Sequence, residues 1–154
     1  MTPVISFRSV EPSDLPIFFA HQLDADATRM AAFPARDRAA FMAHWEKILA
    51  DETTIVNTIV FNGSVAGNMV SWVHEGDRKV GYWLGKEYWG KGISSAALTQ
   101  FLGQVKMRPL YAHVAKHNLA SIRVLQKCGF KLSHSVEEAS NDADASHVLL
   151  TLTA

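Results

Sequence analysis

The dipeptide Asn62-Gly63 joins two stretches rich in β-branched residues, 54–61 and 65–73. Asn-Gly between such stretches is the strongest local signal for a two-residue β-hairpin, because both residues readily take positive φ angles. We therefore expect two antiparallel strands here. The turn at Glu75-Gly76-Asp77 leads to a third strand over residues 78–84, so the middle of the chain is predicted to form an antiparallel meander.

Two helices are predicted before the meander. A short strand over residues 4–8 leads into the segment 11–16, where prolines and a capping serine or aspartate open a helix that runs to about His21. Residues 24–34 are expected to be a loop. Asp37 then caps a second helix, whose apolar residues share one face at helical spacing: Phe41, Trp45, Ile48 and Leu49.

After the meander, helical and strand-like segments alternate. The expected elements are a helix over 93–105, a buried strand over 110–114, a helix over 118–128 that Gly129 ends, and strands over 130–136 and 147–152 joined by a polar connection, 137–145. This order of elements predicts a mixed α/β or α+β fold.

Length and composition narrow the classes of protein. A chain of 154 residues fits one domain, which we expect to span residues 1–154. The 15 basic residues equal the 15 acidic ones, and no basic cluster indicates a nucleic-acid partner. No apolar run approaches the roughly 20 residues of a membrane span. The single cysteine, Cys128, excludes an internal disulfide, and the N-terminus lacks a signal-peptide pattern, so we expect a cytoplasmic protein.

The segment from Tyr82 to Ser95 has the order strand, glycine-punctuated loop, helix start. Gly90 and Gly92 allow backbone N–H groups to converge on an anion, and a helix N-terminus attracts negative charge. The segment therefore suits a diphosphate, although a similar loop can be an ordinary turn. It matches neither the nucleotide P-loop pattern nor the dinucleotide glycine pattern.

A second motif follows at residues 117–130, with the pattern Asn118-x-x-Ser121 and then Lys127-x-Gly129-Phe130. Together with Glu87-Tyr88-Trp89-Gly90-Lys91-Gly92, it resembles the GNAT acetyltransferases. Within that family the motifs are similar to the ribosomal-protein acetyltransferases that modify serine or alanine N-termini. The resemblance covers almost the whole chain.

The resemblance implies a central, mostly antiparallel sheet of six or seven strands, flanked by about four helices. The sheet would splay between the strand ending at Leu84 and the strand ending near Val114, and acetyl-CoA would lie in the gap. Backbone groups around Trp83, Leu84 and Gly85 would bind the pantetheine arm and polarise the thioester carbonyl. The pyrophosphate would be held by N–H groups of the following residues: Trp89, Gly90, Lys91, Gly92, Ile93, Ser94 and Ser95. Ser94 departs mildly from the family's usual glycine or alanine.

Two residues are implied to act in catalysis. Asn118 would bond the pantetheine amide, and Ser121 would protonate the departing thiolate. Much of the family uses a tyrosine four residues later for that purpose, where this chain has Leu125. Arg123 and Lys127 would reach the cofactor phosphates, unless they are simply solvated. The alternative for Asn118 is a purely structural role as a helix N-cap.

The identity of the general base is left open by the sequence. The subgroup often has a glutamate where this chain has Lys79, which leaves His74, Glu75, His113 or a water as candidates. An α-amino group with a pKa of ~7.7 to 8.0 needs less help from a base than a lysine near ~10.4, which favours an α-amine acceptor.

The acceptor pocket is expected at residues 24–33 and the second helix, where Asp24, Asp26 and Arg29 are polar. Cys128 is expected to pack rather than to act as a nucleophile, so transfer would be direct. No metal is implied, and a homodimer is implied only by the resemblance.

The predicted function is acetyl transfer from acetyl-CoA to a primary amine, either a protein N-terminus or a small molecule. The first alternative is a non-catalytic acyl-CoA-binding sensor or regulatory module, which Lys79 and Leu125 make conceivable. The second is a structural domain that binds no cofactor.

Overall fold

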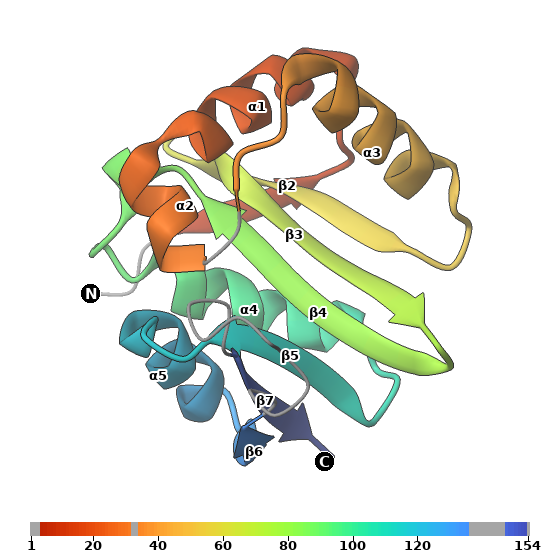
Figure 1. Cartoon of the computed structure of the whole chain (residues 1–154), viewed down its shortest axis with the longest axis vertical. Helices are drawn as coiled ribbons and strands as arrows, with labels where there is room; N and C mark the ends of the chain where they lie inside the picture. Colours follow the sequence, from red (N-terminus) through yellow and green to blue (C-terminus); the bar gives the residue numbers. More distant parts are fainter. Residues whose placement is uncertain (1–3, 32–33, 136–146, 154) are drawn as a thin grey trace.

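The computed structural model describes residues 4–31, 34–135 and 147–153. These residues form one seven-stranded sheet in the order β1-β2-β3-β4-β5-β7-β6 (Figure 1). The strands are β1 (Ile5–Arg8), β2 (Ile55–Phe61), β3 (Ser64–His74), β4 (Asp77–Leu84), β5 (Leu110–Ala115), β6 (Lys131–Ser135) and β7 (His147–Leu152). The mostly antiparallel sheet expected from the sequence is confirmed. The connection predicted over 137–145 lies outside the described residues.

Five α-helices and two short 3₁₀ helices occur in the described part of the chain. They are η1 (Pro12–Asp14), α1 (Leu15–Leu23), α2 (Ala25–Ala31), α3 (Arg38–Ala50), η2 (Lys86–Tyr88), α4 (Ile93–Gln104) and α5 (Leu119–Lys127). None of these helices is long and apolar enough to cross a membrane.

The loop predicted over residues 24–34 is wrong, because α2 occupies most of it. The Asp24 carboxylate accepts the backbone N–H of Ala27 at 3.0 Å, and the following residues include three good helix-forming alanines. This helix is the addition to the expected number of about four.

Both predicted hairpin turns have the expected backbone. Asn62 and Gly63 have φ angles of 51° and 79°, and Glu75 and Gly76 have φ angles of 52° and 84°. Positive φ at both central residues matches the right-handed twist of the strands that they join. The meander β2-β3-β4 is therefore fixed by local sequence.

Hydrophobic side chains pack on both faces of the sheet. On one face, α4 contributes Leu98 and Phe101 to a core that includes Met69 of β3. On the other face, Phe18 of α1 packs with Phe41 and Trp45 of α3. The prediction that Leu49 belongs to the buried face of α3 is wrong, since it is 45% exposed. At 100° per residue Leu49 lies about 80° from Phe41, at the edge of the buried stripe.

The sheet opens between β4 and β5. These two parallel strands pair only at Arg78 with Leu110 and at Lys79 with Tyr111. Beyond Lys79 the strands diverge, while β4 stays paired with β3 as far as Leu84. The predicted splay is confirmed, and it leaves one edge of β4 free of strand pairing.

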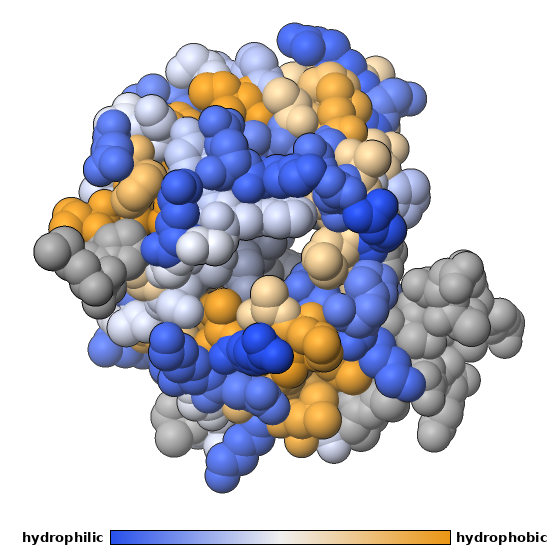
Figure 2. Space-filling model, turned by 90° about the vertical axis from the view of Figure 1, so that its left-hand side faces the viewer, coloured by the Kyte–Doolittle hydropathy of each residue, from blue (hydrophilic) through white to orange (hydrophobic). Residues whose placement is uncertain are grey.

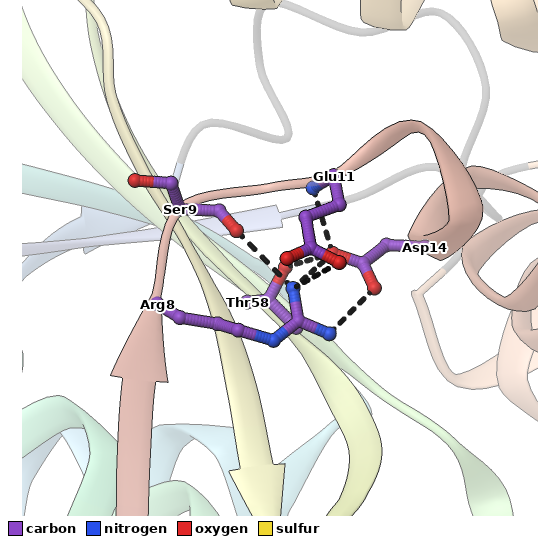
Figure 3. Close-up of polar contacts among 5 residues, drawn as sticks. All are labelled: Arg8, Ser9, Glu11, Asp14 and Thr58. Carbon is purple, nitrogen blue, oxygen red and sulfur yellow. Dashed lines mark hydrogen bonds and ion pairs between the residues drawn. The ribbon is translucent and has the colours of Figure 1, made fainter.

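A buried carboxylate ties the beginning of the chain to β2 (Figure 3). Asp14, only 1% exposed, accepts two hydrogen bonds from the Arg8 guanidinium, at 2.7 and 2.8 Å. It also accepts the backbone N–H of Glu11 at 2.9 Å and the hydroxyl of Thr58 at 2.8 Å. Burial by itself raises the pKa of Asp14, but these hydrogen bonds outweigh it and hold the pKa below its ordinary value.

Because the folded pKa is lowered, Asp14 contributes stability at pH values above the ordinary carboxyl pKa of ~3.9. That contribution is lost as pH falls through the folded pKa. Asp14→Asn should lower the free energy of unfolding at neutral pH by about 2 to 3 kcal/mol, and it should remove this part of the acid dependence. Urea titrations at several pH values measure both effects.

Asp37→Asn is the matched control. Asp37 is an exposed N-cap that accepts the N–H of Ala40, and asparagine caps equally well. Equal losses in the two variants, or an unchanged acid profile in Asp14→Asn, would contradict the assignment.

Candidate active site

A cavity of about 300 Å³, the first cavity, lies beside the free edge of β4. Nine of the residues predicted to contact the cofactor line it: Leu84, Trp89, Gly90, Gly92, Ile93, Ser94, Ser95, Asn118 and Ser121. Figure 2 shows a hollow across the face on which α2, the turn after β4 and α5 lie. The fold therefore brings together two motifs that are separated in the sequence.

The turn that begins α4 presents hydrogen-bond donors to the first cavity. Gly90 and Gly92 have φ angles of 73° and 77°, which glycine adopts without strain. Gly92 is the N-cap of α4 and supplies no capping side chain, and the first helical bond runs from the N–H of Ala96 to its carbonyl. The N–H groups of the first turn can therefore bind an anion, and this donor set fits a pyrophosphate.

Two lysines that were predicted to contact the cofactor, Lys91 through its backbone N–H and Lys127 through its charge, line a neighbouring cavity of about 800 Å³, the third cavity. Lys91 and Lys127 lie there, and the lining includes Gly92 and Ser95, which also line the first cavity. A ligand held by the glycine turn can therefore extend toward both lysines. Arg123 is exposed on α5 and lines neither cavity.

Gly85 does not present free backbone groups to the first cavity. Its N–H donates to the Ala66 carbonyl and its carbonyl accepts the N–H of Tyr88, both at 2.9 Å. A Cβ at Gly85 would also lie 2.6 Å from Nε2 of His21. Gly85 therefore packs α1 tightly against the end of β4.

The backbone of Leu84 faces the gap instead. Antiparallel residues alternate between facing their partner strand and facing away from it, and Gly85 faces β3. By this alternation Trp83 also faces β3, whereas Tyr82 and Leu84 turn their peptide groups toward the gap. The Leu84 carbonyl accepts the Trp89 indole N–H at 3.0 Å, and the Leu84 N–H is directed at the site of the missing strand.

Tyr82 is a functional candidate that the sequence analysis missed. Its hydroxyl lies 2.6 Å from Oγ of Ser121, and both residues line the first cavity. Burial raises the pKa of Tyr82, with the Ser121 hydrogen bond opposing it. Leu125 is 2% exposed and belongs to the core. The period-2 alternation of β4, which puts Tyr82 on the same face as Leu84, was the signal available in the sequence.

Asn118 has the structural role that was its alternative interpretation. It is the N-cap of α5, and its Oδ1 accepts the backbone N–H of Ser121 at 3.2 Å. It also lines the first cavity. Capping uses the amide oxygen, so the Nδ2 group can still donate to a ligand, and the two roles are compatible.

The three candidate bases lie away from the first cavity. His74 and Glu75 are exposed at the β3-β4 turn, and β4 ends at Leu84, seven residues beyond that turn. Nε2 of His113 lies 3.0 Å from Nζ of Lys79. None of the three lines the cavities described here.

The second cavity, of about 560 Å³, lies between the sheet and helices α1 and α3. Its lining comes from α1, the segment before α3, α3 itself, the segment after α3, β3 and β4: Phe18, Gln22, Pro34, Arg36, Phe41, His44, Trp45, Lys47, Ile48, Asp51, Thr54, Asn68, Val70, Trp72, Val73, Gly81, Tyr82 and Trp83. Tyr82 lines both the first and the second cavity.

The acceptor pocket was expected at residues 24–33 and the second helix. That helix, α3, lines the second cavity, whereas residues 24–31 make other contacts. Asp26 pairs with Lys86 and Arg29, and His117 bonds the Arg29 carbonyl at 2.7 Å. Met30 lines the first cavity. Within the described residues, α2 therefore covers the first cavity and contributes nothing to the lining of the second.

Residues 5–131 match the acetyltransferase (GNAT) domain family. The chain belongs to the GNAT family. No curated protein sequence matches it. Among the described residues, no group of three His, Cys, Asp or Glu side chains could hold a metal ion.

Solved GNAT structures share the fold. An acetyltransferase from Bacillus anthracis has a TM-score of 0.82 at 15% identity, covering 99% of this chain and 96% of the other. RimJ from Mycobacterium smegmatis, in complex with CoA-disulfide, has a TM-score of 0.79 at 21% identity, and the match covers 99% of this chain and 83% of the other. Spermidine N-acetyltransferase from Vibrio cholerae, in complex with CoA and spermine, has a TM-score of 0.79 at 16% identity, and the match covers 96% of this chain and 93% of the other.

Lys91→Ala and Lys127→Ala should each weaken the binding of coenzyme A to this GNAT domain by about two- to fivefold, because exposed ion pairs contribute little individually. The loss should shrink as salt is added. Isothermal titration calorimetry at two ionic strengths measures both effects. Lys106→Ala, outside all three cavities, is the control, and an equal loss there would contradict the assignment.

Proposed function

We propose that this protein transfers an acetyl group from acetyl-CoA directly to an α-amino group. The observation that carries the proposal is the hydrogen-bonded pair of Tyr82 and Ser121, which lies in the same cavity as the glycine turn and the free edge of Leu84. Thioester aminolysis uses N–H groups that bind the cofactor pyrophosphate, an N–H that stabilises the developing oxyanion, and a hydroxyl that protonates the departing thiolate. The glycine turn, Leu84 and the hydroxyl pair are suited to these three tasks.

Each group has a distinct task. Acetyl-CoA supplies an acetyl thioester, and transfer forms a C–N bond, breaks the C–S bond and leaves a thiolate that needs a proton. Ser121 donates that proton, and Tyr82 replaces it through their 2.6 Å hydrogen bond. The amine nitrogen loses one proton as the amide forms, and water returns a proton to Tyr82, so the transfer consumes no net proton. The raised pKa of Tyr82 keeps its hydroxyl protonated at neutral pH. The N–H of Leu84 stabilises the negative charge that develops on the carbonyl oxygen.

The second cavity is the proposed acceptor site. It meets the first cavity at Tyr82, so an amine there can approach the thioester from the opposite side. The lining of these cavities includes one carboxylate, Asp51, which already accepts two hydrogen bonds from Thr53. With so little basic assistance, an amine that is partly neutral at physiological pH is favoured, and α-amines meet that condition.

The similarity to solved acetyltransferase structures supports an amine as the acceptor. The similar structures include a spermidine N-acetyltransferase and a ribosomal L7/L12 α-N-protein acetyltransferase. The sensor alternative rested on Lys79 and Leu125. The Tyr82–Ser121 pair weakens it, because it supplies the hydroxyl that is missing at position 125. A cytoplasmic location and a homodimer stay predictions.

Ser121→Ala and Tyr82→Phe should each lower kcat by about 100-fold, the usual contribution of a general acid. Because the two hydroxyls act as one unit, the double variant should lose little more than either single one. Thiol release from acetyl-CoA with a panel of amines measures kcat, and calorimetry should show nearly unchanged CoA affinity.

Tyr111→Phe is the control, since Tyr111 lies on β5 outside the cavities. Asn118→Ala should instead weaken CoA binding and reduce stability through the lost cap. Tight CoA binding without thiol release for any amine would refute the enzyme and favour the sensor.

The acceptor preference is tested with two peptides of one sequence, one with a free α-amine and a blocked lysine, the other with a blocked α-amine and a free lysine. Near neutral pH, thiol release should be faster with the free α-amine, because a larger fraction of it is neutral. The difference should narrow as pH rises. Faster release with the ε-amine near neutral pH would end the α-amine proposal.

A further inference from the structure

The lining of the second cavity is rich in aromatic residues. Its six aromatic residues come from α1, α3, β3 and β4: Phe18, Phe41, Trp45, Trp72, Tyr82 and Trp83. Ile48, Val70 and Val73 add aliphatic surface. A volume of about 560 Å³ lies within the range of sites for small molecules. This composition suits an apolar group.

Trp72 is the most accessible of the aromatic residues around this cavity. It is 36% exposed, and its ring lies against Gly81, where a Cβ would be only 3.3 Å from Cη2. Because Gly81 has no side chain, the ring and the strand together form a flat apolar wall. That wall continues along β4 to Trp83, next to Leu84 at the gap.

The charges around the second cavity are unsuited to a polycation. Arg36 and Lys47 line it, whereas Asp51 is its one carboxylate and is already bonded to Thr53. His44 adds no negative charge, and burial together with Arg36 and Lys47 lowers its pKa. A second positive charge on the acceptor would therefore meet two cationic side chains and a single carboxylate.

The polar residues that remain are neutral. Gln22 is held by the Arg36 backbone, donating to its carbonyl at 3.0 Å and accepting its N–H at 2.7 Å. Asn68 of β3 is paired in register with Trp83 and also lines the second cavity. A neutral amide beside β4 suits the peptide-like carbonyl that follows an α-amine.

We propose that the acceptor is an α-amino compound with an aromatic or large aliphatic side chain, an amino acid or a peptide N-terminus, whose side chain occupies the second cavity. Polyamines, aminoglycosides and other polycations are excluded as good acceptors. The inference rests on the proposed acetyl transfer and names its substrate class.

The test uses amino-acid amides, which share one α-amine and differ in the side chain. Thiol release from acetyl-CoA is measured with the amides of phenylalanine, leucine, norleucine, alanine and lysine, and with spermidine and kanamycin. We expect kcat/KM to be about tenfold or more higher for phenylalaninamide than for alaninamide. kcat/KM for norleucinamide should exceed that for lysinamide by a similar factor, since the two side chains are of similar length and differ in charge.

Two variants examine the cavity itself. Trp72→Ala should reduce kcat/KM for phenylalaninamide about tenfold and leave that for alaninamide nearly unchanged. Lys47→Glu should raise kcat/KM for lysinamide and spermidine relative to kcat/KM for norleucinamide. Lys106→Glu, outside the three cavities, should not change this ratio. Thermal melting of each variant verifies that it is folded.

The outcomes separate the two levels of the proposal. If no amine releases thiol, the acetyl transfer itself fails. If amines are acetylated but kcat/KM for spermidine or kanamycin exceeds that for phenylalaninamide, the acetyl transfer stands and the apolar acceptor is refuted. The same holds if Trp72→Ala lowers kcat/KM for alaninamide as much as for phenylalaninamide.

Discussion

The divergence of β4 and β5 is the constraint on which the site depends. Two parallel strands that pair at only two positions leave one edge of β4 without a partner strand beyond Lys79. Unpaired peptide groups inside a protein are costly, so this edge is stable only where a ligand or solvent satisfies it. The meander maintains the divergence from one side, because β4 stays paired with β3 as far as Leu84.

Local signals predicted much of the fold correctly. Asn62-Gly63 fixed a hairpin that needs positive φ angles, and Asp37 marked the start of α3 through its bond to Ala40. The segment around α2 was misassigned because its helix signal is short and weakly amphipathic. The error at Leu49 arose from treating the edge of a helical face as its centre.

The candidate site was predictable only in part. Glycine spacing and Asn118 indicated the first cavity, because those residues carry their chemistry in local sequence. The contact of Tyr82 with Ser121 joins residues 39 positions apart, and nothing in one sequence reports which strand faces which helix at that separation. The second cavity was also beyond reach, since its lining comes from four elements whose packing is tertiary.

The helix α3 has a particular place in this architecture. It provides Phe41, His44, Trp45, Lys47 and Ile48 to the second cavity, and no residue of the first. Under the proposed function, α3 therefore serves only the acceptor, whereas Tyr82 of β4 lines both cavities. Natural variation along this one helix would then diversify what is acetylated and leave the residues of the first cavity unchanged.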